Sequence, residues 1–280
     1  MIVAVASGKG GTGKTSVVAS FASFNNAVIA DCDVDAPNLH LIFNPKIEEE
    51  ISFEGMKVAE INEKCIKCGK CEKECRFKAI KNFKIISEKC EGCGVCKIVC
   101  PYEAIELKKR ITGKIYVGET RFGKLVYGLL SSGEGSGKLI NQIRQKANEI
   151  SEKGKKPVLI DSSAGIGCPV IASIVNTDLV VIVVEPTLAS IHDMHRIIEV
   201  AEYFKVKFVV IINKYDINEE LTKKIEEYCI DNGIKVVGKI PFDKKFIEAM
   251  VEGKSIVEYD ENFKKLMKKI WNKIEELNYL

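Results

Sequence analysis

Two groups of residues in this sequence combine side-chain types and spacings that could do chemistry: a glycine-rich segment and a set of eight cysteines. The segment from Gly8 to Thr15 reads GKGGTGKT. It matches the pattern G-x-x-x-x-G-K-[S/T], in which backbone N–H groups surround phosphate oxygens, the lysine reaches the terminal phosphates and the hydroxyl binds magnesium. The segment therefore predicts a phosphate-binding P-loop, with Lys14 and Thr15 in the last two roles.

The elements expected on either side of this loop support that prediction. An apolar run from Ile2 to Ala6 precedes the loop and predicts a strand, and the run from Ser16 to Phe24 predicts a helix. The first turn of a helix carries partial positive charge, so this helix would point its positive end at the phosphates. The predicted nucleotide-binding residues of the loop are Gly8, Lys9, Gly10, Gly11, Thr12, Gly13, Lys14, Thr15 and Ser16.

The eight cysteines form two copies of the spacing C-x2-C-x2-C-x3-C, offset by 25 residues. The copies are Cys65, Cys68, Cys71 and Cys75, and then Cys90, Cys93, Cys96 and Cys100. In two-cluster bacterial ferredoxins, which this pattern resembles, the first three cysteines of a copy bind one cluster and the fourth binds the other. Two 4Fe-4S clusters are expected, with the ligand sets Cys65, Cys68, Cys71, Cys100 and Cys90, Cys93, Cys96, Cys75.

Other residues of this segment bear on the cluster prediction. Gly69 and Gly94 occupy equivalent places in the two copies and are expected to form tight turns. Arg76 stands where ferredoxins usually have proline, which affects the rigidity of the loop but removes no ligand. Zinc is the alternative metal, although structural zinc sites are closed by four ligands and seldom use three cysteines in this spacing.

Lys9 adds a second signal within the P-loop. A lysine directly after the first glycine resembles the deviant Walker A motif of the MinD, ParA and nitrogenase-iron-protein group of ATPases. In that group this lysine reaches across a dimer interface to the nucleotide of the partner subunit. The resemblance implies an ATP-dependent homodimer that binds and hydrolyses ATP with Mg²⁺. The alternative is that Lys9 is a solvated loop lysine.

Carboxylates at two expected strand ends complete the site that the resemblance implies. The apolar run 27–30 leads into Asp31-Cys32-Asp33, which resembles switch I, where the second aspartate orients the attacking water and joins the magnesium shell. This second aspartate is Asp33, whereas Asp31 and Asp35 could be ordinary turn and capping residues instead. The run 157–161 ends in Asp161 and fits the Walker B strand. The implied catalytic residues are Lys9, Lys14 and Asp33, and the implied Mg²⁺ ligands are Thr15, Asp33 and Asp161.

The segment 162–167 resembles switch II of the same ATPases, and Cys168 follows it directly. The nitrogenase iron protein has a cluster-ligating cysteine at a similar offset, but it needs a second such cysteine in each subunit, and neither Cys32 nor Cys229 is a convincing candidate. A small buried residue is the more ordinary interpretation of a single cysteine. If Cys168 were a ligand, Cys168→Ser would lower the iron content below the two-cluster value.

Two residues at later strand ends are expected to flank the nucleotide base: Asn213 after the apolar run 208–212, and Pro241 after the run 236–240. In related ATPases these places lie at the adenine. The last expected helix, 261–277, has one apolar face and a lysine-rich opposite face. A membrane-targeting helix would have this pattern, but docking onto the sheet is favoured because the sheet would otherwise lie partly uncovered.

Composition limits the possible functions. With 42 basic and 39 acidic residues among 280, the net charge is +3 and the charges are interspersed, so the sequence does not predict a nucleic-acid binder. The longest apolar run, 179–184, is far too short to span a bilayer. Eleven cysteines, eight of them clustered, suit metal or cluster ligation in a reducing compartment better than disulfides. We therefore expect a cytoplasmic protein.

Together these features predict an α/β P-loop ATPase with a mostly parallel sheet flanked by helices, and an inserted α+β ferredoxin-like unit. Residues 1–59 and 108–280 would form the ATPase, with a hairpin at about 114–129, and residues 60–107 the insert. The expected function couples nucleotide-driven dimer switching to electron transfer with a redox or iron-sulfur client. The alternatives are an iron-sulfur or metal-cofactor carrier and a MinD-like positioning or scaffolding ATPase.

Overall fold

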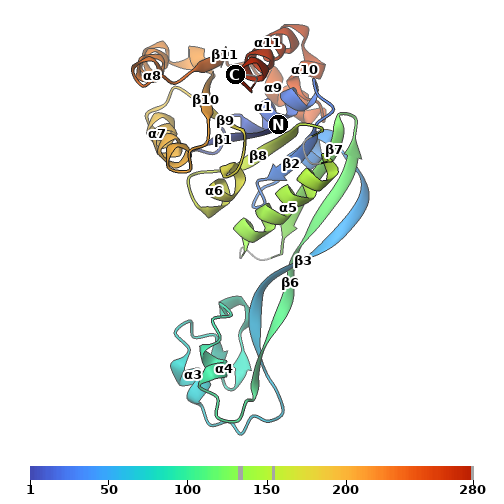
Figure 1. Cartoon of the computed structure of the whole chain (residues 1–280), viewed down its shortest axis with the longest axis vertical. Coiled ribbons are helices and arrows are strands. Elements are labelled where there is room, and N and C mark those ends of the chain that lie inside the picture. Colours follow the sequence, from blue (N-terminus) through green and yellow to red (C-terminus); the bar gives the residue numbers. More distant parts are fainter. Residues whose placement is uncertain (132–134, 153–154, 279–280) are drawn as a thin grey trace. The chain divides into compact units, whose positions relative to one another are not determined.

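The computed structural model describes residues 1–131, 135–152 and 155–278, which divide into two compact units (Figure 1). The first unit consists of Met1–Glu50, Ile115–Leu129 and Ser136–Leu280, and the second of Ile51–Lys114 and Leu130–Gly135. The second unit is thus larger than the predicted 60–107 insert, because the strands that lead into and out of the cysteine segment are longer than expected.

Within the described residues, nine strands form one sheet in the order β11-β10-β9-β1-β8-β2-β7-β6-β3. Their bounds, in that order, are Val236–Ile240, Phe208–Asn213, Leu179–Val184, Ile2–Ser7, Val158–Ala164, Val28–Cys32, Gly123–Leu130, Ile105–Thr120 and Lys46–Ile61. Every pairing from β11 to β7 is parallel. The predicted mostly parallel α/β sheet is therefore confirmed.

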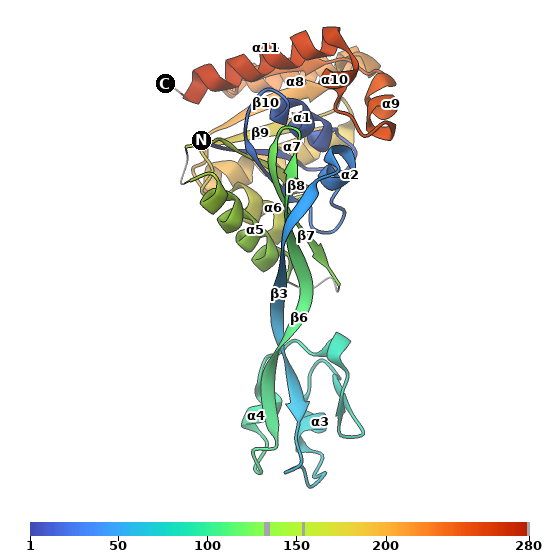
Figure 2. The same cartoon turned by 90° about the vertical axis from the view of Figure 1, so that its right-hand side faces the viewer.

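Helices cover both faces of the parallel part of the sheet. On one face α1 (Lys14–Ala22) contacts α11 (Glu261–Asn278), and on the other lie α5 (Ser136–Ile150), α6 (Cys168–Ile174) and α7 (Leu188–Tyr203) (Figure 2). Strands covered on both faces read as continuous apolar runs, as β9 does. The remaining helical segments of the first unit are α2 (Leu39–Phe43), η2 (Tyr215–Ile217), α8 (Glu219–Asp231), α9 (Lys245–Val251) and α10 (Ile256–Tyr259).

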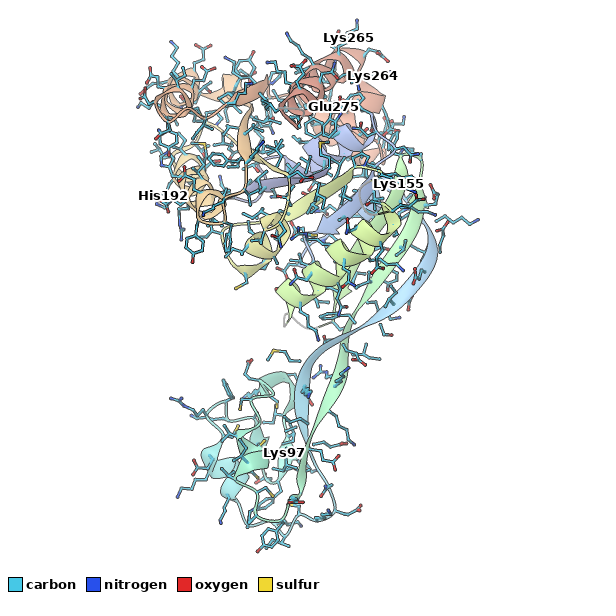
Figure 3. The ribbon with its side chains drawn as sticks, in the orientation of Figure 1. Lys97, Lys155, His192, Lys264, Lys265 and Glu275 are labelled. Atoms are coloured by element: carbon cyan, nitrogen blue, oxygen red, sulfur yellow. The ribbon has the colours of Figure 1, made fainter. Side chains whose placement is uncertain are left out.

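The apolar face of α11 is buried in the core. Trp271 is fully buried, and its ring centroid lies 5.0 Å from that of Phe21 on α1. Lys264 and Lys265 project outward from the opposite face (Figure 3). Docking onto the sheet therefore accounts for the amphipathic pattern of this helix, as the sequence favoured. No helix in the described ranges combines the length and the apolar character that crossing a membrane requires.

The expected hairpin is present, but its strands differ from the prediction. The sequence placed the hairpin at about 114–129; instead β6 begins at Ile105, and a turn at Arg121 and Phe122 joins it to β7. Strand β3 was not predicted at all. Most of its side chains are exposed and its first half is rich in glutamate, so it lacks the alternation of apolar and polar residues that marks a half-buried strand.

The second unit repeats its backbone conformation as well as its sequence. Helices α3 (Lys70–Glu74) and α4 (Val95–Ile98) each begin after a left-handed glycine, Gly69 with φ 77° and Gly94 with φ 81°. Two further pairs of residues with positive φ are separated by the same offset: Lys67 with Gly92, and Lys78 with Glu103. The short elements β4 (Ile80–Lys81), β5 (Lys84–Ile85) and η1 (Ser87–Lys89) connect the two copies.

Candidate functional site

The carboxyl ends of the parallel strands bring the predicted nucleotide residues to one edge of the sheet. The P-loop follows β1, and Asp161 lies on β8 beside Val5 of β1 and Asp31 of β2. Asn213 ends β10, and Pro241 comes directly after β11. Open parallel sheets bind their ligands at this edge.

Two glycines of the P-loop take backbone conformations that other residues rarely adopt. Gly11 has φ 78° and Gly13 has φ 95°, and Gly13 directly precedes α1. A Cβ at Gly13 would also collide with the side chain of Asn213, and one at Gly8 with Asp193 of α7. The loop can therefore curl tightly and begin the helix only with glycine at these positions.

A cavity of about 510 Å³ opens beside the P-loop in the first unit. Nine of the predicted nucleotide and magnesium residues line it: Gly10, Gly11, Gly13, Lys14, Thr15, Ser16, Asp33, Asn213 and Pro241. Gly8, Lys9, Thr12 and Asp161 do not line it. Lys14 is only 6% exposed, so its charge acts in a largely dry environment, where electrostatic interactions are stronger than in water.

Asp161 is almost completely buried next to this cavity. The Thr15 hydroxyl donates a hydrogen bond to its carboxylate, but Oδ1 has no hydrogen-bond partner among the residues that the structure describes. Burial raises the pKa of Asp161 to about 7, against the opposing effects of Thr15 and Lys14. A buried carboxylate oxygen without a partner is costly unless a proton or a cation satisfies it. Its surroundings therefore fit the predicted Mg²⁺ site.

Asp33 lines the cavity, and a buried neighbour holds it in place. Burial raises the pKa of Asp33, and the nearby Lys14 opposes that effect. The Asp31 carboxylate is fully buried and accepts backbone N–H groups from Asp33, Asn38 and Leu39 at 3.1, 3.2 and 3.1 Å. Asp31 thus shapes the turn that presents Asp33, which agrees with the turn role considered for it from the sequence.

Lys9 forms an ion pair within its own chain. Its ammonium lies 3.1 Å from Glu185 Oε1, while Lys214 Nζ lies 2.8 Å from Glu185 Oε2 and donates to the carbonyl of Gly11 at 3.0 Å. Burial would raise the pKa of Glu185, but hydrogen bonds from Lys214 and Lys9 outweigh it and lower the pKa. Sequence reasoning missed Glu185, although a glutamate directly after the wholly apolar strand β9 was a visible signal.

Asn213 contacts the P-loop itself. Its Nδ2 donates to the carbonyl of Thr12 at 2.7 Å, and its Oδ1 accepts the N–H of Lys214 at 3.0 Å. Both ends of the amide are therefore engaged with the backbone, and the expected contact with adenine stays a prediction. Sequence reasoning missed four large apolar residues of the cavity wall, which are Phe242, Phe246, Ile247 and Met250.

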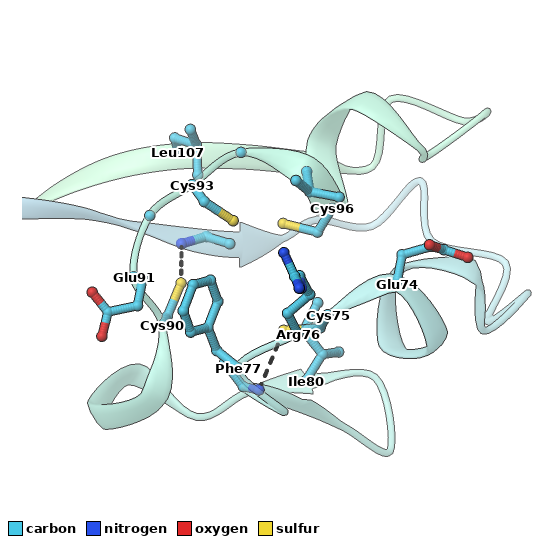
Figure 4. Close-up of a pocket in the computed structure, with 15 residues that line it drawn as sticks. Glu74, Cys75, Arg76, Phe77, Ile80, Cys90, Glu91, Cys93, Cys96 and Leu107 are labelled. Carbon is cyan, nitrogen blue, oxygen red and sulfur yellow. Dashed lines mark hydrogen bonds between the residues drawn. The ribbon is translucent and has the colours of Figure 1, made fainter.

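The eight clustered cysteines divide between two pockets of the second unit. One pocket, of about 380 Å³, is lined by Cys75, Cys90, Cys93 and Cys96 (Figure 4). A much narrower one, of about 10 Å³, is lined by Cys65, Cys68, Cys71 and Cys100. In each pocket, three cysteines of one copy meet the fourth cysteine of the other, which is the division expected from the sequence.

Backbone N–H groups point at the sulfur atoms of four of these cysteines, at 3.3 to 3.4 Å. The equivalent residues Cys75 and Cys100 each accept from the residue four positions later, Ala79 and Ala104. Among the described residues, no three His, Cys, Asp or Glu side chains are arranged to hold a single metal ion.

The other three cysteines belong to the first unit. Cys32 and Cys229 are buried, and burial raises the pKa of the Cys229 thiol to about 11. Cys168 is exposed at the start of α6. Cys32 and Cys229 are therefore small core residues, whereas the structure assigns no core role to Cys168.

Residues 3–256 match the family described as the CobQ/CobB/MinD/ParA nucleotide binding domain. The chain belongs to this family. An uncharacterized protein of Methanocaldococcus jannaschii is 38% identical over 282 residues, which cover 99% of this chain and 97% of the relative. The septum site-determining protein MinD of Helicobacter pylori is 25% identical over 300 residues, or 100% of this chain and 93% of that protein.

Solved structures of MinD proteins share the fold of this CobQ/CobB/MinD/ParA family member. MinD of Pyrococcus horikoshii, complexed with Mg-ADP, superimposes with a TM-score of 0.61 at 17% identity, covering 99% of this chain and 96% of that one. A MinC–MinD complex of Aquifex aeolicus gives a TM-score of 0.60 at 20% identity, covering 98% and 95%. These likenesses show the fold, and the family match supports nucleotide binding.

Proposed function

We propose that this protein is an ATP-hydrolysing switch of the MinD and ParA kind, in which ATP pairs two copies of the chain and hydrolysis separates them. The observation that carries the proposal is the convergence of Lys14, Thr15 and Asp33 on one cavity, with the nearly buried Asp161 beside it. The Asp161 oxygen that has no hydrogen-bond partner among the described residues supports a cation at this place.

Each residue of the site has a role in this proposal. The P-loop N–H groups and Lys14 hold the phosphates of ATP, and Asp33 orients the attacking water. Thr15, Asp33 and Asp161 hold Mg²⁺, which neutralises charge on the phosphate oxygens when it is bound. A likeness to a MinD protein complexed with Mg-ADP supports this ligand. The exposed apolar residues Phe242 and Ile247 offer a surface for the base.

The test is the oligomeric state of the purified chain with Mg²⁺ and ADP, ATP or a non-hydrolysable ATP analogue, followed by light scattering after size-exclusion chromatography. We expect dimers with the analogue and monomers with ADP. The ATPase rate per chain should rise with protein concentration, because hydrolysis would need the paired state. Lys9→Ala should bind nucleotide yet stay monomeric. A chain that remains monomeric with every nucleotide would overturn the proposal.

A second function is favoured by the cysteine pockets, and we propose that they bind two 4Fe-4S clusters. Four thiols from both copies of the repeat surround each pocket, and backbone N–H groups point at four of the sulfurs, as hydrogen bonds to cluster ligands do. Each thiolate of such a cluster binds a different iron. The ligands therefore lie further apart than those of a single ion, which reconciles these pockets with the lack of a single-ion site in the described residues.

The ligand sets would be Cys75, Cys90, Cys93, Cys96 and Cys65, Cys68, Cys71, Cys100. Such clusters supply one-electron transfer when bound. The wider pocket has room for a 4Fe-4S cluster without rearrangement, whereas the narrower pocket would have to widen. Complete ligation by four cysteines holds a cluster firmly, which favours a resident redox group over delivery to a client.

An anaerobic redox titration followed by electron paramagnetic resonance tests whether the two functions are coupled. A shift of about 60 mV or more on adding Mg²⁺ and an ATP analogue would mean at least about 1.4 kcal/mol of coupling between nucleotide and cluster. No shift, together with cluster transfer to an apo-protein, would instead favour a carrier. A preparation without iron after anaerobic reconstitution would remove the cluster proposal and leave the nucleotide switch intact.

A further inference from the structure

Glu185 contacts two lysines that lie on opposite sides of its carboxylate. One oxygen is paired with Lys9 of the P-loop at 3.1 Å, and the other with Lys214 at 2.8 Å. The Glu185 side chain is only 8% exposed, whereas that of Lys9 is 44% exposed. The carboxylate is therefore a fixed feature of the site, and Lys9 is the partner that can leave.

In the proposed switch, Lys9 moves away from this carboxylate to reach a nucleotide on another chain. An ammonium within hydrogen-bond distance of a carboxylate is held by a charge-assisted bond, and phosphate oxygens would have to replace that bond. Pairing through Lys9 therefore includes the cost of breaking its contact with Glu185, once in each of the two chains.

Lys214 keeps this cost small. A nearly buried carboxylate that loses its only cation is strongly destabilised, but Glu185 keeps Lys214 when Lys9 departs. Lys214 also donates to the carbonyl of Gly11, so the carboxylate stays connected to the P-loop. Lys9 can therefore leave without making Glu185 an unpaired buried charge.

We propose that Glu185 is a positioning residue that holds Lys9 in its own chain and thereby sets the threshold for ATP-dependent pairing. The inference rests on the proposed dimer switch and adds its control: the strength of the contact between Glu185 and Lys9 decides how much protein is needed before two ATP-bound chains associate. It requires no contact of Glu185 with nucleotide.

The decisive variant is Glu185→Gln, because the amide has nearly the same shape but no charge to hold Lys9. The dissociation constant of the dimer, measured by light scattering or analytical ultracentrifugation with Mg²⁺ and an ATP analogue, should fall about tenfold, as expected when two partly exposed ion pairs of modest strength are removed. The protein concentration for half-maximal ATPase should fall equally. The maximal rate per chain should stay within about twofold, since Lys14 and Asp33 are untouched.

Two controls separate this role from a structural one. Glu226→Gln removes an ion pair of similar geometry, with Lys239 at 2.9 Å, far from the P-loop in sequence and should leave the dimer constant unchanged. Glu185→Asp keeps the charge and should restore wild-type pairing. In the Lys9→Ala background, Glu185→Gln should give no gain, because the residue through which it acts is missing.

The possible results distinguish a failure of the proposed role of Glu185 from a failure of the proposed dimer switch. If the wild-type chain does not pair with the ATP analogue, the proposed switch is wrong and the inference fails with it. If the wild-type chain pairs and Glu185→Gln pairs equally or more weakly, the switch stands and the role of Glu185 is overturned. General damage to the P-loop would weaken pairing, so tighter pairing cannot arise from misfolding.

Discussion

In the first unit a large apolar core positions the side chains that are predicted to bind nucleotide. In the second unit some of the predicted ligands, the cysteines, are themselves part of the core. Lys14 begins α1, which buries Phe21, and Asp33 directly follows β2, which buries Ile29. The buried cluster around the cysteines of the second unit consists, among the described residues, of Ala59, Cys71, Ala79, Ile80, Cys90 and Ile105. Two of these six are predicted ligands.

This difference affects what each unit needs in order to fold. This cluster of mostly small side chains removes little apolar surface from water, and small domains often add disulfides or a metal to a limited apolar core. The 11 cysteines are free thiols. We therefore expect the second unit to depend on a group bound by its cysteines, while the first can be preformed before nucleotide arrives.

Removing bound iron should produce the largest difference between the two units. Chelation under anaerobic conditions should unfold the second unit and leave the first folded, because only the second has ligands in its core. Limited proteolysis with mass spectrometry should then show rapid cleavage within residues 51–114, while the remainder still binds Mg-ADP. Equal resistance of both units after iron removal would contradict the comparison.

The nucleotide site should lose its function without losing its fold. Lys14→Ala removes a charge-assisted contact to the terminal phosphates, so ATP affinity should fall about 10- to 100-fold. Fluorescent nucleotide binding measures the loss, and circular dichroism should show an unchanged melting temperature within a few degrees. The iron content should stay at the wild-type value. A large drop in iron would mean that the two units depend on each other more than their separate cores indicate.

The pH dependence of magnesium binding tests the buried carboxylate of the first unit. The pKa of Asp161 is raised to about 7 by burial, so below that pH Mg²⁺ must displace a proton, and above it the site is already ionised. Affinity for Mg²⁺ should therefore rise about tenfold from pH 6 to pH 8 and level off. Because the pKa in the folded chain exceeds that in the unfolded chain, folding stability without Mg²⁺ should fall as pH rises towards 7.

Isothermal titration calorimetry in the presence of ADP measures both the affinity and the released proton. The nucleotide has its own ionisation in this range, so Asp161→Asn is the matched control: it keeps the titration of the phosphate and loses that of the carboxylate. A variant with the same pH dependence as the wild-type chain would show that Asp161 does not carry the effect.

A smaller effect is expected when one cysteine pocket is disturbed at a time. Cys68 and Cys93 are the equivalent exposed cysteines of the two copies, so Cys68→Ser and Cys93→Ser should each reduce iron by about half, through the loss of one cluster. Cys168→Ser should leave iron unchanged if Cys168 is no ligand. Iron and sulfide analysis after identical reconstitution decides both points, and a loss of all iron in either single variant would show that the clusters cannot form independently.

Sequence alone predicted the features that depend on residues close together in the chain. The P-loop needs glycine at Gly11 and Gly13 because the backbone is left-handed there, and consecutive residues reveal that requirement. The two cysteine copies are equally local. By contrast, Glu185 meets Lys9 across 176 positions, and no periodicity indicates which strand end will face the P-loop. Strand β3 escaped prediction because its first half is exposed and rich in glutamate, so no alternation of apolar and polar residues marks it there.

The last comparison is between the two cysteine pockets, which arise from one repeat yet differ at Arg76. Arg76 lines the wider pocket, has no carboxylate partner among the described residues, and extends into the pocket in Figure 4. A cation close to a cluster stabilises its reduced, more negative form and raises its potential. Arg76→Gln should therefore lower the potential of one cluster by about 60 mV, equivalent to roughly 1.4 kcal/mol for one electron, and leave the other within error.

Lys78→Gln is the matched control for this shift. It removes the same charge two positions later, from a residue that lines neither of the two pockets, so it should move both potentials by much less. Protein-film voltammetry resolves the two couples without requiring any enzymatic activity. If both variants lower both potentials equally, general charge accounts for the effect, and the two pockets are equivalent in spite of Arg76. If only Arg76→Gln changes the difference between the two potentials, the arginine that stands in place of proline at this position makes the two clusters different.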